Sequence, residues 1–335
     1  MITVSLCMIV KNESKVLSRC LDSVADLVDE IVIVDTGSDD DTKAIARLYT
    51  DRVYDFKWID DFAAARNYAF SLCECDYIYS ADADEILNEE NRQKFRILKE
   101  TLDPEIEIVQ MYYGNQLENG TVYNFDRELR PKLFKRVRQF KWIERVHETV
   151  RTDPVVYDSD IEITHKPLTN HASRDYRVFE DMIRNGEKFS PRLFSFYARE
   201  LFVSGEKDDF KKAEDFFTQI ADDDETSRDD LKIAICIVVK AAYWRQDYLK
   251  MYRYAMKDVA DDPCSEICFL LGEYYEDQRD YKEAAIWYYN AAFECHSILN
   301  VKYEKEYAVQ GLVDVYNNLG LTEQAREYER LLRES

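Results

Sequence analysis

The sequence predicts a two-domain fold, in which an α/β domain with a Rossmann-like, mainly parallel sheet is followed by an all-α domain. In the first half, apolar β-branched runs alternate with helical patterns, which is typical of βαβ units. After Lys166 the strand signals end, and a helical pattern recurs about every 34 residues. The predicted domains are residues 1–168 and 169–335, and two is the number expected for a chain of 335 residues.

Short elements follow one another in the first half. Each predicted strand is a run of apolar and β-branched residues, and each predicted helix has apolar residues at helical spacing. Strands are expected at residues 2–10, 29–35, 52–58 and 75–81, with helices between them at 11–28, 39–49 and 60–73. Further strand signals, which could extend the sheet with an antiparallel piece, lie at 105–115, 121–125, 131–137 and 161–165.

Three of the predicted strands end in polar residues. These ends are residues 11–13, 35–38 and 82–84. The carboxyl ends of parallel strands meet at one edge of a sheet, where ligands of such folds bind. We therefore expect the three polar ends to open onto the same ligand-binding edge.

Asp82 and Asp84 form a D-x-D pair at the exit of the fourth predicted strand. Both carboxylates can reach one divalent cation if the backbone turns between them, and such oxygen ligands suit Mg²⁺ or Mn²⁺. The alternative is the capped start of a helix with acidic residues in its first turn. Glu85 stays undecided between a helix cap and a group that tunes its neighbours.

Asp35 and Arg66 are further candidate ligand-binding residues at the predicted edge of the sheet. Asp35 ends a strand, Gly37 is free to take positive φ, and a carboxylate at such a strand end commonly binds ribose or a base. The alternative is a tight turn with a helix cap at Ser38 or Asp39. Arg66 stands on a helix of small apolar residues, where it could neutralise a diphosphate or pair with a neighbouring Asp.

The second half has the spacing of tetratricopeptide repeats. Small residues let paired helices approach closely, and aromatic residues fill the gaps between pairs. The recurring positions are Gly272, Tyr275, Ala284, Tyr288 and Ala291; Tyr197, Leu201, Ala213, Phe217 and Ile220; Val313, Tyr316, Ala325 and Leu332; and a degenerate unit at Lys250 and Tyr254. Positions 213, 250, 284 and 325 are 37, 34 and 41 residues apart. We predict an α-solenoid of about three to four repeats, with ordinary helical hairpins as the alternative.

The composition disfavours some classes of protein. A net charge of −22 makes the chain a poor partner for nucleic acid and for anionic membranes, because both repel it. Eight Cys without zinc-type pairs predict reduced, buried thiols in a cytoplasmic protein. No apolar run approaches the ~18 residues of a membrane span, so we expect no transmembrane segment.

Taken in order, the motifs of the first half resemble glycosyltransferase family 2. They read "VSLCMIVKNES", "DEIVIVDTGSDDDT", "FKWIDDFAAARNYAF" and "DYIYSADADE". The resemblance covers about residues 3–165 and is greatest to the branch that carries C-terminal tetratricopeptide repeats, which includes enzymes similar to bacteriocin peptide glycosyltransferases. It implies a GT-A fold, a nucleotide-sugar donor that is usually a UDP-sugar, and Mn²⁺ or Mg²⁺ as the cofactor.

The resemblance also implies a donor site. The nucleotide-sugar would be bound by Val10, Lys11, Asn12, Glu13, Asp35, Arg66, Asp82, Ala83, Arg130 and His147. Asp35 would hold the base or the ribose, and Arg66 would lie near the base or the phosphates. Asp82, Asp84 and His165 would be the metal ligands, with Asp84 the more direct one and a catalytic residue. The metal stabilises charge that develops on the departing diphosphate.

Residues 130–150, "RPKLFKRVRQFKWIERVHETV", resemble the acceptor-side segment of the family. Direct displacement with inversion needs a carboxylate that takes the acceptor's proton. Glu148 is the candidate for this catalytic base, and Asp126 is a weaker one. The alternative for Glu148 is an ion pair with Arg145 or Arg151.

The sequence departs from the family pattern at several positions. Glu144 stands where Gly is common and Lys135 where Arg is usual, which puts the shape of the local loop in question. Lys166 and Pro167 follow the strand-end His165, where the family often has Gly and Tyr.

We therefore predict a metal-dependent, inverting glycosyltransferase that moves a sugar from a UDP-sugar to a hydroxyl or thiol of a peptide or protein. The helical domain would hold the acceptor or form a homodimer. The alternatives are transfer to a saccharide or cell-surface glycan precursor, and a binding scaffold with a degenerate catalytic half. A sugar nucleotidyltransferase is disfavoured, because no Gly-rich phosphate loop follows the first strand.

Overall fold

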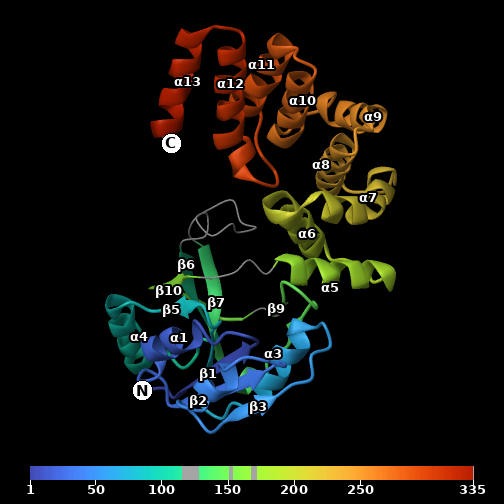
Figure 1. Cartoon of the computed structure of the whole chain (residues 1–335). Helices are drawn as coiled ribbons and strands as arrows, with labels where there is room; N and C mark the ends of the chain where they lie inside the picture. The colour runs from blue at the N-terminus through green and yellow to red at the C-terminus, as the bar shows by residue number, and fades with distance from the viewer. Residues whose placement is uncertain (115–127, 151–153, 167–171, 335) are drawn as a thin grey trace. The chain divides into compact units, whose positions relative to one another are not determined.

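A computed structural model describes residues 1–114, 128–150, 154–166 and 172–334 (Figure 1). Among these residues the chain divides into two compact units, one up to Val178 and one from Phe179 onwards. The first unit is α/β and the second is helical. The predicted fold class, an α/β domain followed by an all-α domain, is therefore confirmed.

The first unit is built on an eight-stranded sheet with the order β3-β2-β1-β4-β7-β6-β10-β5. The strands are β1 (Val4–Val10), β2 (Glu30–Asp35), β3 (Val53–Asp55), β4 (Tyr77–Ser80), β5 (Glu85–Ile86), β6 (Ile108–Gly114), β7 (Glu128–Lys135) and β10 (Val156–His165), and β8 (Trp142–Ile143) pairs separately with β9 (Thr149–Val150). Strands β1 to β4 are parallel, whereas β7 runs antiparallel to both β4 and β6. The sheet is thus mainly parallel with an antiparallel piece, as predicted. The strand predicted at 121–125 lies outside the described residues.

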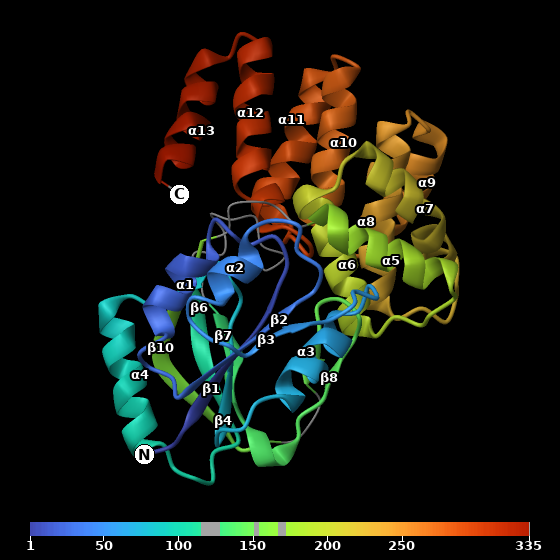
Figure 2. The same ribbon diagram turned by 60° about the horizontal axis from the view of Figure 1, so that its bottom comes forward.

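Helices cover the two faces of this sheet unequally. They are α1 (Leu17–Val24), α2 (Thr42–Ala46), α3 (Phe62–Ser71) and α4 (Glu89–Thr101). Alternate residues of a strand point to opposite faces, so Leu6 and Met8 pack with α1 and α4 while Cys7 packs with α3. Figure 2 shows α1 and α4 on one side of the strands and α3 on the other.

The strand order places a topological switch point at β1. From β1 the chain proceeds to β2 and β3 on one side, and β4 pairs with β1 on the other. Val10 pairs with Asp35, and Cys7 pairs with Ser80, so the residues after β1, β2 and β4 leave the sheet at one edge. A ligand of such a sheet binds at this edge.

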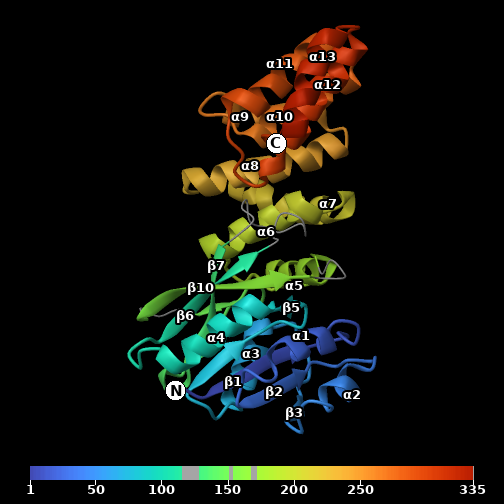
Figure 3. The same cartoon turned by 90° about the vertical axis from the view of Figure 1, so that its left-hand side faces the viewer.

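The second unit is a stack of helices. They are α6 (Pro191–Ser204), α7 (Lys207–Ala221), α8 (Arg228–Trp244), α9 (Tyr248–Val259), α10 (Ser265–Asp277), α11 (Tyr281–Tyr289), α12 (Glu306–Asn318) and α13 (Thr322–Glu334), and α5 (Ala172–Arg184) spans the division between the units. Helices α6, α8, α10 and α12 contact one another in that order, and each precedes its partner in a hairpin (Figure 3). This is the packing expected of tetratricopeptide-like repeats.

Small and aromatic residues pack between these helices as predicted. Ala213, Ala284 and Ala325 are buried on the second helix of their hairpins. A Cβ at Gly272 would lie 2.6 Å from the buried ring of Tyr288, so glycine permits the approach of α10 to α11.

The longest predicted repeat spacing, 41 residues, has a structural cause. A π-helical turn (Asn290–Glu294), a loop and a 3-10 turn (Val301–Tyr303) stand between α11 and α12. The buried carboxylate of Glu266 on α10 accepts hydrogen bonds from backbone N–H groups of this insertion, including that of Leu299 at 2.7 Å. The buried Lys240 on α8 donates to the hydroxyl of Tyr303 at 2.6 Å. Across the described parts of both units, no helix is long and apolar enough to span a membrane.

Candidate active site

The loops after β1 and β2 are joined by hydrogen bonds. The N–H of Asn12 donates to the hydroxyl of Ser38 at 2.9 Å, and the Asn12 side chain accepts from the N–H of Asp39 at 2.9 Å. The N–H of Glu13 donates to the hydroxyl of Thr42 at 2.7 Å. Asn12 has φ +58°, a conformation that Asn tolerates better than most residues. Residues 11–13 and 35–38 thus form one rim, as predicted from the strand ends.

Asp35 lies below this rim and is fully buried. Its Oδ1 accepts hydrogen bonds from the N–H groups of Gly37 and Ser38, both at 2.9 Å, and lies 3.7 Å from the ammonium of Lys43. Gly37 takes φ +103°, which glycine adopts without strain. Oδ2 of Asp35 is buried without a hydrogen-bond partner among the described residues. A buried carboxylate oxygen without a partner suits a ligand that donates a hydrogen bond.

Residues 82–85 form a turn that leads into β5, and α4 starts only at Glu89 with Asn88 as its cap. The alternative of a capped helix start at Asp82 is therefore wrong. Because the backbone turns here, the side chains of Asp82 and Asp84 leave the strand end in different directions. Ala83 between them is buried.

Arg66 connects α3 to the strand-end carboxylates. Its guanidinium donates to Asp82 at 2.8 Å, to the hydroxyl of Ser80 at 3.1 Å and to Glu148. Burial alone would lower the pKa of Arg66, but the carboxylates of Asp82 and Glu148 raise it above its usual value. Burial would likewise raise the pKa of Asp82, and the charges of Arg66 and Lys132 hold that pKa well below its usual range. Asp82 and Arg66 are therefore both charged over the physiological pH range.

Asp84 meets the predicted third ligand, His165. An Oδ2 of Asp84 lies 3.1 Å from Nε2 of His165, which ends β10 beside β5. Asp82 turns instead to Arg66, so the ligand atoms of the three predicted metal ligands do not all lie within 4.8 Å of one another. The structure brings together Asp84 and His165, and Asp82 lies two residues before Asp84 on the same turn.

A buried ion pair that the sequence did not predict lies under this turn. Glu85 is buried, and its Oε1 lies 2.5 Å from the ammonium of Lys132 on β7. The guanidinium of Arg130 lies 3.9 Å from the ring centroid of Tyr113, whose ring also faces His165 at 5.1 Å. Arg130 also pairs with Glu128.

The surroundings of Glu85 show that its side chain is not a helix cap. Burial raises its pKa, and Lys132 opposes that rise. Glu85 is thus a buried partner of Lys132 beneath Asp82 and Asp84, and it does not cap α4. Charged residues that alternate with apolar ones in a strand usually face solvent, so no local pattern around Lys132 indicated that its side chain is buried.

The loop between β8 and β9 lies against the start of α3. The N–H of Phe62 donates to the carbonyl of Arg145 at 2.8 Å, and Arg145 donates to the carbonyl of Asp60 at 3.0 Å. Glu144 takes φ +71°, a conformation that favours glycine, so the loop keeps the shape that Gly would adopt. His147 also has positive φ, at +49°.

Glu148 has a partner different from those considered for it. It pairs with Arg66. The guanidinium of Arg66 also lies over the ring of Trp142, with its central carbon 5.2 Å from the ring centroid. Arg145 makes the backbone contact described above. Asp126 and Arg151 lie outside the described residues.

Comparison with known proteins shows which family the N-terminal part of the chain resembles. Residues 5–152 match the model of glycosyl transferase family 2. The N-terminal part of the chain is therefore a glycosyl transferase family 2 domain, and the resemblance drawn from the motifs is confirmed.

Individual relatives share parts of the chain. It is 51% identical over 87 residues to a TPR repeat-containing protein of Synechococcus elongatus, which is 26% of this chain and 22% of that protein. It is 28% identical over 219 residues to the SPbeta prophage-derived glycosyltransferase SunS of Bacillus subtilis, which is 60% of this chain and 50% of that protein. The chain thus matches at most half the length of these two relatives.

Among solved structures, the chain is similar to glucosyl-3-phosphoglycerate synthase from Mycobacterium tuberculosis in complex with Mn²⁺ and UDP-glucose. The match has 16% identity and a TM-score of 0.40, and it covers 56% of this chain and 81% of that one. A likeness this distant carries no argument about ligands.

Proposed function

We propose that this glycosyl transferase family 2 chain moves a sugar from a nucleotide-sugar donor, in particular a UDP-sugar, to a hydroxyl or thiol of a peptide or protein, with inversion. Residues 1–168 would be the catalytic domain and residues 169–335 the domain that holds the acceptor. The observation that carries the proposal is the buried, unpartnered Oδ2 of Asp35 at the switch-point edge.

Asp35 is suited to recognise the nucleoside. Its Oδ1 is fixed by two backbone N–H groups, so Oδ2 is held at a constant position. An N–H of a base or a hydroxyl of ribose would supply the hydrogen bond that Oδ2 lacks. Lys11 and Asn12 on the adjacent rim would line the same part of the ligand.

The residues of the neighbouring turn fit a divalent cation. Asp84 and His165 supply a carboxylate oxygen and an imidazole nitrogen 3.1 Å apart, and Asp82 supplies a second carboxylate. Mn²⁺ and Mg²⁺ accept this donor set, and Mn²⁺ tolerates the nitrogen better. The bound cation would stabilise charge on the leaving diphosphate. The protein's own part is to hold Asp84 through His165 and to keep Asp82 ionised through Arg66.

Glu148 is the proposed general base. Arg66 holds its Oε1, and Oε2 makes no hydrogen bond within the described part of the chain, so one oxygen can accept the proton of the acceptor. A carboxylate that takes this proton while the acceptor attacks gives displacement in one step, and therefore inversion. In Glu148→Gln we expect kcat to fall about 10²–10⁴-fold, with the KM for the donor nearly unchanged.

The acceptor side of the proposal rests on the helical unit. Stacked helical hairpins form extended surfaces that hold peptide segments, and a second copy of the chain could use the same surface. The enzyme and its acceptor are proposed to be cytoplasmic, in keeping with the eight reduced thiols expected from the sequence.

The test is turnover of a panel of nucleotide sugars by the full chain with Mn²⁺ or Mg²⁺. We expect metal-dependent release of a nucleoside diphosphate from one donor, reduced at least about 100-fold in Asp84→Asn. Asp51→Asn is the matched control, since Asp51 is exposed and precedes β3 at the opposite end of that strand. Full activity of Asp84→Asn would contradict the metal assignment. Neither turnover nor binding across the panel would instead favour a scaffold with a degenerate catalytic half.

A further inference from the structure

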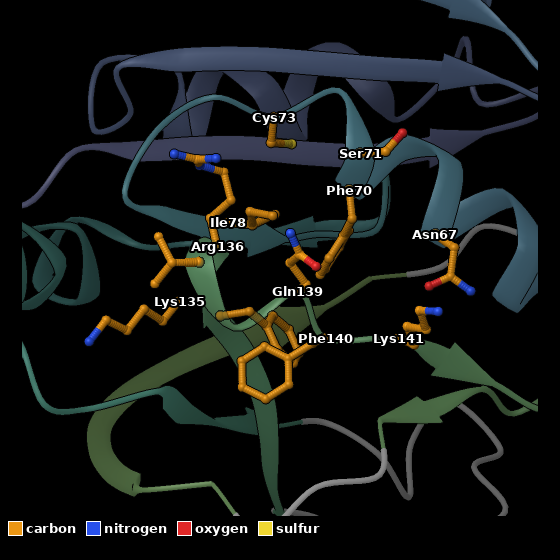
Figure 4. A pocket seen from close by; sticks show the side chains of 12 residues that line it. Asn67, Phe70, Ser71, Cys73, Ile78, Lys135, Arg136, Gln139, Phe140 and Lys141 are labelled. Carbon is orange, nitrogen blue, oxygen red and sulfur yellow. The ribbon is translucent and has the colours of Figure 1, made fainter.

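A pocket lies on the face of the sheet that α3 covers. It has a volume of about 700 Å³ and lies between the end of α3, the start of β4 and the turn after β7. Its walls include the buried side chains of Phe70, Ile78, Phe134 and Phe140 (Figure 4). Pockets of this size and apolar character are typical of sites for small molecules.

The pocket exists because this face is only partly covered. Helix α3 packs on β1 and β2 and contacts β8, so this face of β4 and β7 is covered only by the residues of the turn after β7. Phe134 contacts Phe70, Phe140 and Trp142 edge-on, with centroids 5.4–5.8 Å apart. These aromatic contacts keep the apolar walls in place.

The rim of the pocket is positively charged. Lys135, Arg136 and Lys141 line it, and residues 130–143 contain no Asp or Glu although the whole chain has a net charge of −22. Lys135 and Arg136 donate to backbone carbonyl oxygens, and Arg136 also attracts the carboxylate of Asp76. Lys141 is exposed and makes no ion pair with any described residue.

The side chain of Gln139 completes the lining. Figure 4 shows its amide near Phe70 and Ile78, with Lys135 and Arg136 to one side and Lys141 to the other. Gln139 is exposed and its amide makes no hydrogen bond to described residues, so it can bind a polar group of a ligand. Apolar walls, a free amide and a cationic rim together select a molecule that has an apolar body and an anionic group.

We propose that this pocket binds a small anionic amphiphile, a molecule with an aromatic or aliphatic body and one carboxylate, sulfonate or phosphate group. The site is separate from the donor site, since none of the residues proposed for nucleotide or metal binding lines it. This proposal is independent of the glycosyltransferase activity, because its test measures only the binding of a small molecule.

The probe is 8-anilinonaphthalene-1-sulfonate, titrated into the folded full chain and followed by its fluorescence. We expect one saturable site, and an affinity about fivefold or more lower in Lys141→Glu, because a cation at the rim becomes an anion. Arg47→Glu is the matched control, because Arg47 is exposed on the other side of the unit and should leave the affinity unchanged. Gln139→Trp, which fills the pocket with an indole, should abolish the site.

Three results would overturn the proposal. The first is the absence of saturable binding, and the second is binding that Lys141→Glu and Gln139→Trp leave unchanged. The third is equal affinity for the uncharged N-phenyl-1-naphthylamine, which would show that the cationic rim selects nothing. Circular dichroism of each variant establishes that it is folded, so that a lost site is not mistaken for a lost fold.

Discussion

Arg66 is the residue whose replacement tests the architecture of the site most broadly. Its guanidinium is 12% exposed and compensates two carboxylates, Asp82 and Glu148. Arg66→Met keeps much of the side-chain volume but leaves both carboxylates without their cation. Removal of one partner of a buried ion pair costs about 3–5 kcal/mol. The Asp82 side chain is 40% exposed, so solvent screens part of the loss, and we expect a decrease of about 3 kcal/mol in the free energy of unfolding at pH 7.

The pH dependence of this decrease has a defined sign. In the native protein the pKa of Asp82 is depressed, so its contribution to stability is present above the pKa of about 4 of an unfolded Asp. That contribution is lost as pH falls through the depressed folded value. In Arg66→Met the carboxylate of Asp82 loses this stabilisation and is protonated at a higher pH than in the native protein. The stability difference between the two proteins should therefore shrink by at least about 1 kcal/mol between pH 5 and pH 3.

The assay is urea unfolding followed by tryptophan fluorescence. Both proteins carry Trp244→Phe and Trp287→Phe, so that Trp58 and Trp142 report on the first unit alone. Arg66→Lys keeps the positive charge but lacks the planar guanidinium that can donate to both carboxylates. Its loss in the free energy of unfolding should lie between zero and that of Arg66→Met.

Lys94→Met is the matched surface control. Lys94 pairs with Glu90 and Asp160, whose side chains are 75% and 79% exposed, and its replacement should cost less than about 1 kcal/mol. A loss in Arg66→Met no larger than in Lys94→Met, or one that does not change with pH, would show that Arg66 does not stabilise the two carboxylates.

Two further predictions concern packing and buried charge. Lys132→Met leaves Glu85 buried without its cation and should destabilise the first unit by about 3–5 kcal/mol, and the added change Glu85→Gln should recover part of that loss in the same urea assay. A double variant as unstable as Lys132→Met alone would contradict the buried pair. Gly272→Ala places a methyl group 2.6 Å from the ring of Tyr288 and should lower the stability of the helical unit by about 1–3 kcal/mol, measured through Trp244 and Trp287. An unchanged or higher stability would mean that α10 and α11 do not need glycine for their approach.

The sequence could predict the ligand edge because it depends on local patterns and one topological rule. Asp35 and Asp82 follow apolar runs, and parallel strands must end at a common edge. The helical half was predictable for a similar reason, since Ala213, Ala284 and Ala325 mark equivalent positions of units that are 34 to 41 residues apart.

The contacts between distant segments could not be predicted in this way. The pairing of Arg66 with Glu148 spans 82 residues and depends on how the β8–β9 loop folds onto α3. Glu85 and Lys132 are 47 residues apart, and a charged residue next to two aspartates is usually solvated, so its burial had no local signal. The insertion after α11 shows only as a longer repeat spacing, and its anchoring by Glu266 follows from tertiary packing.

We propose that the switch-point edge binds a nucleoside diphosphate through Asp35. Calorimetric titration of the full chain with UDP in the presence of Mn²⁺ tests it, with Asp35→Asn as the isosteric variant. Asn keeps the oxygen that accepts from Gly37 and Ser38 but replaces the unpartnered Oδ2 with an amide donor. We expect one UDP site per chain and an affinity about 10–100-fold lower in Asp35→Asn. Equal affinity of the two proteins for UDP, or binding of no nucleoside diphosphate by either, would contradict it.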